Sequence, residues 1–221
     1  MGITSKKTSK KTSKKTQKNS EKNSQKPKTI LLKSLAHLTD DEIIQLSQIT
    51  NDLTIMKFIG KGNIWSLEDL LKYRKEELHN EKLNHRNRTH YSYVLINNSR
   101  VIGFIEGRKN KSLLPKINKS TNKLSSSYDI LMRLFISQKY KGMGYGKLII
   151  QLFIDQYKTL LEKYFKKHKI NNTARICLYS DIDPNNIASI KIHLHNNFLP
   201  HGTFKYPNNK IYNRYKYNVM I

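Results

Sequence analysis

The sequence has few of the residues that tie a chain together covalently or hold it in a membrane. Its 221 residues include one cysteine, Cys177, which excludes an intramolecular disulfide and a cysteine-based zinc site within one chain. No apolar run approaches the ~20 residues that a membrane-spanning helix needs. Residues 1–28 also lack the apolar segment of a secretory signal. We therefore expect an intracellular, cytoplasmic protein without a membrane span.

Acidic residues are also scarce. The chain has 16 Asp and Glu against 41 Lys and Arg, which gives a net charge of +25. Such a surplus favours anionic partners, namely nucleotides, nucleic acid or acidic membrane surfaces, without choosing among them. The richness in Lys, Asn and Ile also fits an AT-rich coding sequence, which would raise the lysine content without any selection for binding.

The first 28 residues form a low-complexity segment. Thr4-Ser5-Lys6-Lys7 recurs at 8–11 and 12–15, and ten lysines against one glutamate give the segment +9 of the +25. We expect a disordered basic tail over 1–28, because nothing in it after Ile3 can anchor a core. A single domain is expected over 29–221. The tail is either a nucleic-acid-binding or targeting arm, which leaves a nuclear or nucleic-acid-associated location open, or a solubilising extension.

Periodicity and capping residues predict the order of elements from residue 29 onward. Thr39 and Ser66 are each followed three residues later by an acid, which is typical of helix starts. Asn97-Asn98-Ser99 between two apolar runs indicates a hairpin, and 109–127 reads as a long basic loop. The predicted strands are 29–32, 91–96, 101–106, 130–136, 174–179, 199–206 and 211–220. Three predicted helices begin at residues 39, 53 and 66, and two more span 148–165 and 186–196. This order predicts an α+β or mixed α/β sheet domain.

A glycine cluster, Lys141-Gly142-Met143-Gly144-Tyr145-Gly146, separates an expected strand from an expected helix. Glycines allow the backbone to approach a phosphate, and the N–H groups of the first helical turn receive it. A P-loop would need Ser or Thr where Leu148 follows Gly146-Lys147. A dinucleotide fingerprint would need its third glycine one residue later than Gly146. Both alternatives fit poorly, while Lys139, Lys141 and Lys147 add positive charge for an anion.

The segment 134–148 resembles the acetyl-CoA-binding motif of the GNAT N-acetyltransferase superfamily, Arg/Gln-x-x-Gly-x-Gly/Ala after the fourth core strand. Gly144 and Gly146 occupy its glycine positions, and Lys141 stands where the family usually has Arg or Gln. About forty residues later, 183–198 looks like the family's next segment, Asn-x-x-Ser-x-x-x-Tyr-x-x-x-Gly-Phe. There Asn186, Ser189 and Phe198 stand in register.

The resemblance implies a GNAT-like fold: a central, mostly antiparallel sheet of six to seven strands with splayed central strands and flanking helices. It also implies acetyl-CoA as cosubstrate, no metal, and direct transfer of the acetyl group to a primary amine in a ternary complex. The backbone N–H of Phe135 or Ile136 would hold the pantetheine arm and the thioester oxygen. The residues assigned to the coenzyme are Phe135, Ile136, Lys141, Gly142, Met143, Gly144, Tyr145, Gly146, Lys147 and Asn186.

Catalytic residues are harder to assign. His193 stands where the family commonly has the Tyr proposed to protonate the leaving thiolate, and imidazolium is a stronger acid than a thiol. Glu106 or Asp129, at strand ends, is a candidate base. The loss of the Tyr keeps a second hypothesis open: a weakly active or inactive GNAT-like scaffold that binds nucleic acid or another anion. The acceptor and the oligomeric state are not readable from the sequence.

Overall fold

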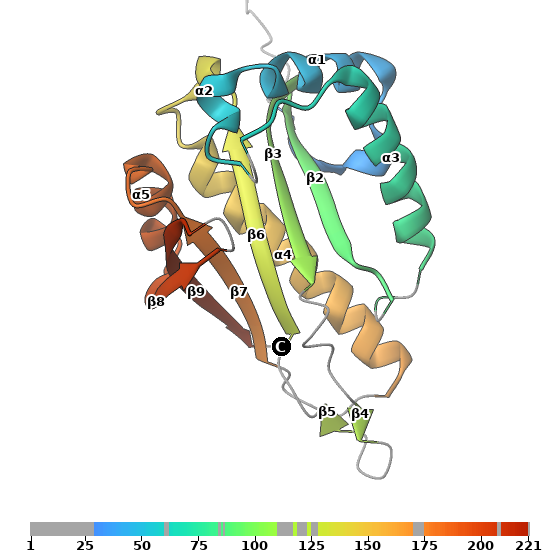
Figure 1. Ribbon diagram of the computed structural model, residues 1–221. Coiled ribbons are helices and arrows are strands. Elements are labelled where there is room, and N and C mark those ends of the chain that lie inside the picture. The colour runs from blue at the N-terminus through green and yellow to red at the C-terminus, as the bar shows by residue number, and fades with distance from the viewer. Residues whose placement is uncertain are drawn as a thin grey trace, which may run out of the picture.

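The computed structural model describes residues 29–59, 62–83, 85, 87–109, 117–118, 123–124, 128–169, 175–206 and 209–220. Its elements form three layers, with a central sheet between two groups of helices (Figure 1). The basic tail predicted over 1–28 and most of the loop predicted over 109–127 lie outside the described residues.

The sheet has seven strands and is mostly antiparallel, as predicted. Its spatial order is β1-β2-β3-β6-β7-β9-β8, and only β6 and β7 pair in parallel. These strands are β1 (Ile30–Ser34), β2 (His90–Asn97), β3 (Arg100–Lys109), β6 (Tyr128–Ile136), β7 (Arg175–Ile182), β8 (Leu199–Lys205) and β9 (Ile211–Met220). Within the predicted loop, β4 (Ile117–Asn118) and β5 (Lys123–Leu124) pair as a separate two-stranded sheet, so the prediction of an unstructured loop is wrong for these residues.

The helices begin at the predicted caps. Thr39 and Ser66 each form a capping box, with Glu42 and Asp69 respectively, at the starts of two helices. The second predicted helical piece, 53–59, is only one turn long. The helices are α1 (Asp40–Thr50), α2 (Leu53–Met56), α3 (Leu67–Lys82), α4 (Tyr145–Lys167) and α5 (Ile187–His195), with 3₁₀ turns at Leu35–His37 and Gln138–Tyr140.

Each face of the sheet has its own hydrophobic core. α4 and α5 cover one face, where Phe153, Tyr157 and Phe198 are fully buried. α1, α2 and α3 cover the other face, where the rings of Phe104 and Phe135 stack at 5.3 Å. In Figure 1 this second helical layer lies over the β1, β2 and β3 side of the sheet. The part of this face over β7, β8 and β9 is not covered by these helices.

The sheet parts in its middle. β6 and β7 pair only from Tyr128–Ile176 to Leu131–Tyr179, although β6 continues to Ile136 and β7 to Ile182. Beyond Leu131, the edge of β6 that faces β7 therefore makes no backbone pairing with β7. The splayed central strands that the resemblance implied are present, and they leave a gap through the sheet.

Candidate functional site

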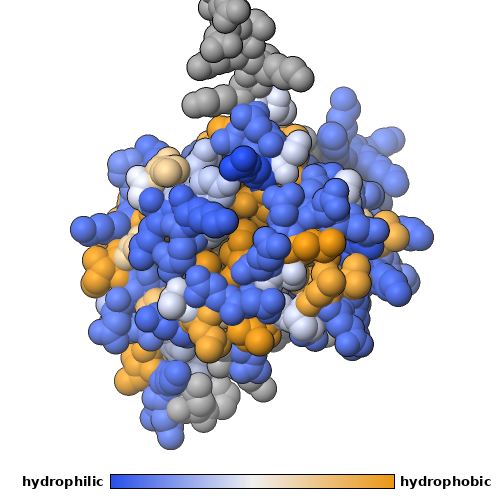
Figure 2. Space-filling model, turned by 90° about the horizontal axis from the view of Figure 1, so that it is seen from above, coloured by the Kyte–Doolittle hydropathy of each residue, from blue (hydrophilic) through white to orange (hydrophobic). Residues whose placement is uncertain are grey.

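A cavity of about 380 Å³ lies at the gap between β6 and β7. Three groups of residues line it: the end of β6 with the glycine turn, the start of α5, and the α2 region. They are Leu134, Phe135, Ile136, Gln138, Tyr140, Lys141, Gly142, Gly144, Tyr145, Gly146, Lys147, Asn186, Ala188, Ser189, Ile192, Thr54, Ile55, Phe58 and Ile59. Seen from above, hydrophobic side chains reach the surface in the middle of this end of the molecule, among hydrophilic ones (Figure 2).

The glycine turn has the backbone that its sequence suggests. Gly142 and Gly144 have φ of +79° and +81°, the left-handed region that disfavours a side chain. A Cβ at either position would meet no atom within 4 Å, so both glycines border open space. Gly146 differs, because a Cβ there would lie 3.1 Å from the end of the Ile192 side chain of α5, which would have to shift slightly. Two glycines thus shape the turn, and the third permits close helix packing.

The start of α4 is built for an anion rather than for a side-chain cap. Whereas α1 and α3 carry acids and capping boxes in their first turns, α4 has Gly144 as N-cap, no side-chain cap and no acid in its first turn. The N-terminus of a helix carries partial positive charge and exposed N–H donors. Lys147 in that turn and Lys141 before it add further positive charge at the cavity wall. Such an arrangement is unfavourable without a bound anion and suits a pyrophosphate.

The register of β6 shows that the two backbone amides predicted to hold the pantetheine arm, those of Phe135 and Ile136, point in opposite directions. The N–H of Ser137 donates to the Ile102 carbonyl of β3 at 2.8 Å, and ladder groups alternate along a strand. The N–H of Phe135 is therefore directed to β3, while those of Leu134 and Ile136 are directed to the gap. Between the two predicted amides, the geometry favours Ile136.

Asn186 lies at the opposite wall of the cavity, as the N-cap of α5. Its Oδ1 accepts a hydrogen bond from the N–H of Ser189 at 3.2 Å, so the carboxamide nitrogen is the atom that can be offered to a ligand. Tyr145 is held by Asn97, whose Nδ2 donates to its hydroxyl at 2.7 Å. Met143 is the exception among the predicted coenzyme residues: its side chain is largely exposed and is not part of the cavity lining.

Comparison with known proteins identifies this arrangement. A model described as the acetyltransferase (GNAT) family matches residues 61–195, which span both the glycine turn and α5. The chain belongs to the GNAT family. No curated protein matches its sequence.

Solved GNAT structures share the fold. An N-acetyltransferase from Staphylococcus aureus Mu50 is 15% identical, with a TM-score of 0.55 over 86% of this chain and 98% of that one. An aminoglycoside acetyltransferase in complex with coenzyme A is 15% identical, with a TM-score of 0.54 over 86% and 94%. The structure of that acetyltransferase with paromomycin and acetyl-CoA is 16% identical, with a TM-score of 0.53 over 85% of this chain and 92% of that one. These likenesses extend over almost the whole length of each relative and establish the GNAT fold.

His193, which the sequence resemblance aligns with the usual GNAT tyrosine, lies in a closed environment. Its side chain is 2% exposed, is absent from the cavity lining and meets the Phe198 ring edge-on at 5.0 Å. Nδ1 donates to the Ser189 carbonyl at 2.8 Å, and no described residue offers a hydrogen-bond partner to Nε2. Burial lowers the pKa of His193 to about 4, although the bond to Ser189 acts in the opposite direction. A neutral imidazole out of the cavity does not suit a general acid, so we do not propose this role.

The buried imidazole predicts a specific loss of stability in acid. The unfolded chain takes up a proton below an ordinary pKa of about 6.5, whereas folded His193 stays neutral until about pH 4, so the stability is complete above pH 6.5 and falls as the pH drops. Between pH 7.5 and pH 5 this one group should cost about 2 kcal/mol. His193→Phe should remove that share of the loss, measured by urea unfolding at both pH values.

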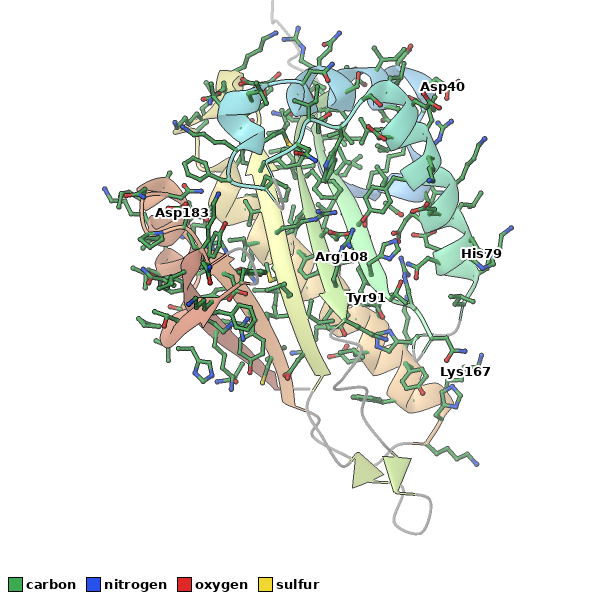
Figure 3. All side chains as sticks on the ribbon, viewed as in Figure 1. Asp40, His79, Tyr91, Arg108, Lys167 and Asp183 are labelled. Atoms are coloured by element: carbon green, nitrogen blue, oxygen red, sulfur yellow. The ribbon has the colours of Figure 1, made fainter. Side chains whose placement is uncertain are left out.

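His79→Gln is the control for this measurement, because His79 is exposed on α3 (Figure 3). It should lose as much free energy of unfolding between the two pH values as the wild type does. Buried His85, whose pKa burial lowers to about 2, adds a loss of similar size in the same range, which both variants keep. An unchanged pH dependence in His193→Phe would contradict the buried, neutral assignment.

Glu106 and Asp129, the two candidate bases, lie in different places. Glu106 is fully buried on β3, where Arg108 lies 2.9 Å away, Arg133 forms a second ion pair, and the Tyr73 hydroxyl donates to it. Asp129 is the second residue of β6 and lies seven residues before Ile136, which is about 23 Å along a strand. Neither carboxylate lines the cavity. The structure therefore does not bring a predicted base to the gap.

The residues that the sequence assigned to the coenzyme include none from α2 or from the turn after it. Thr54, Ile55, Phe58 and Ile59 border the cavity, and Gln138 of the 3₁₀ turn before the glycine turn donates to the Thr54 hydroxyl at 2.9 Å. One signal was available, since Phe58 is apolar and precedes a Gly-Lys-Gly segment, yet it remains 36% exposed. Phe58 and its neighbour Ile59 thus add apolar surface to the wall of the cavity.

In the described part of the chain, no group of three or more His, Cys, Asp or Glu side chains is arranged to hold a metal ion. No helix there is long and apolar enough to cross a membrane.

Proposed function

We propose that this GNAT protein is an acetyl-CoA-dependent N-acetyltransferase that moves an acetyl group to a primary amine. One observation carries the proposal: the cavity runs from an uncapped, lysine-flanked helix start into the gap between two splayed strands. Such a cavity suits two parts of coenzyme A. The helix start would bind the pyrophosphate, and the gap between the strands would hold the narrow pantetheine arm. GNAT neighbours hold coenzyme A and acetyl-CoA.

Each part of the cavity has a role in this proposal. The N–H groups of the turn 142–146 and the cations Lys141 and Lys147 would bind the pyrophosphate. The Ile136 N–H and the Asn186 carboxamide would bind the pantetheine arm and orient the thioester, which supplies the acetyl group. Phe58 and Ile59 would cover the arm and exclude water.

Direct transfer from thioester to amine is part of the proposal. The acceptor nitrogen forms the new C–N bond, the C–S bond breaks, and the proton that the amine loses balances the one that the thiol gains. A thiol nucleophile at the gap would favour an acyl-enzyme instead. Cys177, the only cysteine of the chain, is 2% exposed on β7 and outside the cavity lining, which supports transfer within a ternary complex.

Ligand-dependent stability tests the coenzyme part of the proposal. Acetyl-CoA at 100 times its Kd should raise the free energy of unfolding by about 2.7 kcal/mol, while NAD and ATP at equal concentration should raise it far less. Mass spectrometry of amine acceptors incubated with acetyl-CoA tests the transfer. The absence of saturable acetyl-CoA binding would overturn the proposal and favour a scaffold that binds other anions.

A further inference from the structure

The two ends of the cavity lie on opposite faces of the sheet. The glycine turn, α4 and α5 belong to the face of the first core, whereas Phe58 and Ile59 follow α2 in the layer that covers the other face. If the phosphates are held at the start of α4, an acceptor must approach the gap from the α2 and α3 side. We call this side, which carries Trp65, Glu106, Arg108, Arg133, Tyr179, Asp181, Arg214 and Lys216, the acceptor face.

Cations dominate what the first wall of the acceptor face presents to solvent. Two guanidinium groups, those of Arg108 and Arg133, share the single carboxylate of Glu106. Glu106 is fully buried, whereas the Arg108 side chain is 54% exposed and that of Arg133 is 25% exposed. Arg133 is held over the Trp65 ring, 4.7 Å from its centroid. The cluster therefore has one uncompensated positive charge, with its acid hidden and its cations outward.

The second wall repeats this arrangement. Arg214 of β9 holds Asp181 of β7 through two hydrogen bonds of 2.6 and 2.7 Å, and the Asp181 side chain is only 3% exposed. Lys216 lies over the Tyr179 ring at 5.5 Å on the same face. Asp129, the third acid of the face, lies at the far end of β6, next to Cys177 in the register. The accessible charges are thus cationic on the first wall, whereas on the second wall Lys216 and Asp129 both lie beside Tyr179.

We propose that the acceptor is a primary amine that also carries an anionic group, a carboxylate or a phosphate, bound by Arg108 and Arg133. The inference rests on the proposed acetyltransferase function. Guanidinium groups bind both anions through paired, charge-assisted hydrogen bonds. Arg133 lies on β6 directly beside Leu134, whose amide is directed to the gap, so an anion bound there places a tethered amine near the acetyl donor.

None of the acids of the acceptor face lines the cavity, so the proton that the amine loses would pass to water. The surplus positive charge of the cluster of Arg108, Arg133 and Glu106 would be balanced by the anionic group of the acceptor. Polycationic acceptors, in contrast, would be repelled by this surplus charge.

Matched acceptor pairs test the proposal with the full-length protein and acetyl-CoA. β-Alanine is compared with β-alaninamide, and phosphoethanolamine with ethanolamine; spermidine and kanamycin serve as polycations. We expect kcat/KM to be about tenfold or more higher for at least one anionic member than for its neutral partner, and lowest for the polycations. The two pairs distinguish carboxylate from phosphate recognition.

Arg108→Gln should bring the ratio of kcat/KM between the anionic and the neutral member of the preferred pair close to one. The substitution removes an exposed cation, while Arg133 stays paired with Glu106. Arg108→Lys should restore part of the ratio. Arg74→Gln, which removes a guanidinium paired with Asp40 outside the acceptor face, should leave the ratio at its wild-type value. Equal kcat/KM within both pairs, or a preference for polycations, would overturn this inference and leave the acetyltransferase function standing. Absence of transfer to every amine, with acetyl-CoA bound, would overturn the function and the inference together.

Discussion

Replacement of Gly144 by valine is expected to weaken the binding of coenzyme A about 100-fold. Gly144 has φ of +81°, and a β-branched residue in that region costs about 1–3 kcal/mol. Relief of this strain would rotate the peptide groups of the turn, and the N–H donors at the start of α4 would no longer converge on one phosphate site. Isothermal titration with coenzyme A measures the change in Kd.

Gly202 provides a matched control for backbone strain. It has φ of +89°, and a Cβ there would also meet no atom within 4 Å, but it lies on β8, outside the cavity lining. Gly202→Val should lower the free energy of unfolding about as much as Gly144→Val does, and should leave the Kd for coenzyme A unchanged. If both variants bind equally well, the turn does not hold the phosphates.

Local sequence signals were enough to predict most elements of the fold. The caps Thr39 and Ser66 start helices, and Asn98 and Ser99 adopt the positive φ values of a tight hairpin turn. These features depend on residues a few positions apart, so a sequence displays them directly. The length of α2 and the pairing of β4 with β5 were not predicted from these local signals.

The residues of the candidate site show the same distinction between local signals and contacts made on folding. The glycine turn is contiguous, so its residues could be named from the sequence. The choice of Ile136 over Phe135 required the register between β3 and β6, and the contribution of Phe58 required the position of α2. The environments of Glu106 and His193 are set by residues that fold against them, namely Arg133 on a neighbouring strand and Phe198 beyond α5. Residue type alone suggested proton transfer for both, while burial and pairing suggest structural roles.

Glu106→Gln is expected to lower the free energy of unfolding by about 3 kcal/mol. The substitution keeps the size of the side chain but removes the carboxylate that compensates Arg108 and Arg133, and breaking a buried ion pair leaves an uncompensated charge. Tyr73 can still donate to the glutamine oxygen, so the loss reports charge rather than packing. Urea unfolding measures it, and because Glu106 does not line the cavity, the folded variant should bind acetyl-CoA with a wild-type Kd.

Glu162→Gln is the matched control, since the Glu162 side chain is 51% exposed on α4 and its Lys158 partner lies 4.0 Å away. Exposed pairs of this kind contribute little, so its free energy of unfolding should change by less than about 0.5 kcal/mol. Adding Arg133→Gln to Glu106→Gln should recover part of the lost stability, because it removes one of the two uncompensated cations. A Glu106→Gln variant that is as stable as the wild type yet inactive, with acetyl-CoA still bound, would instead make Glu106 the catalytic base. The chemistry of the acceptor face would then depend on a carboxylate rather than on its arginines.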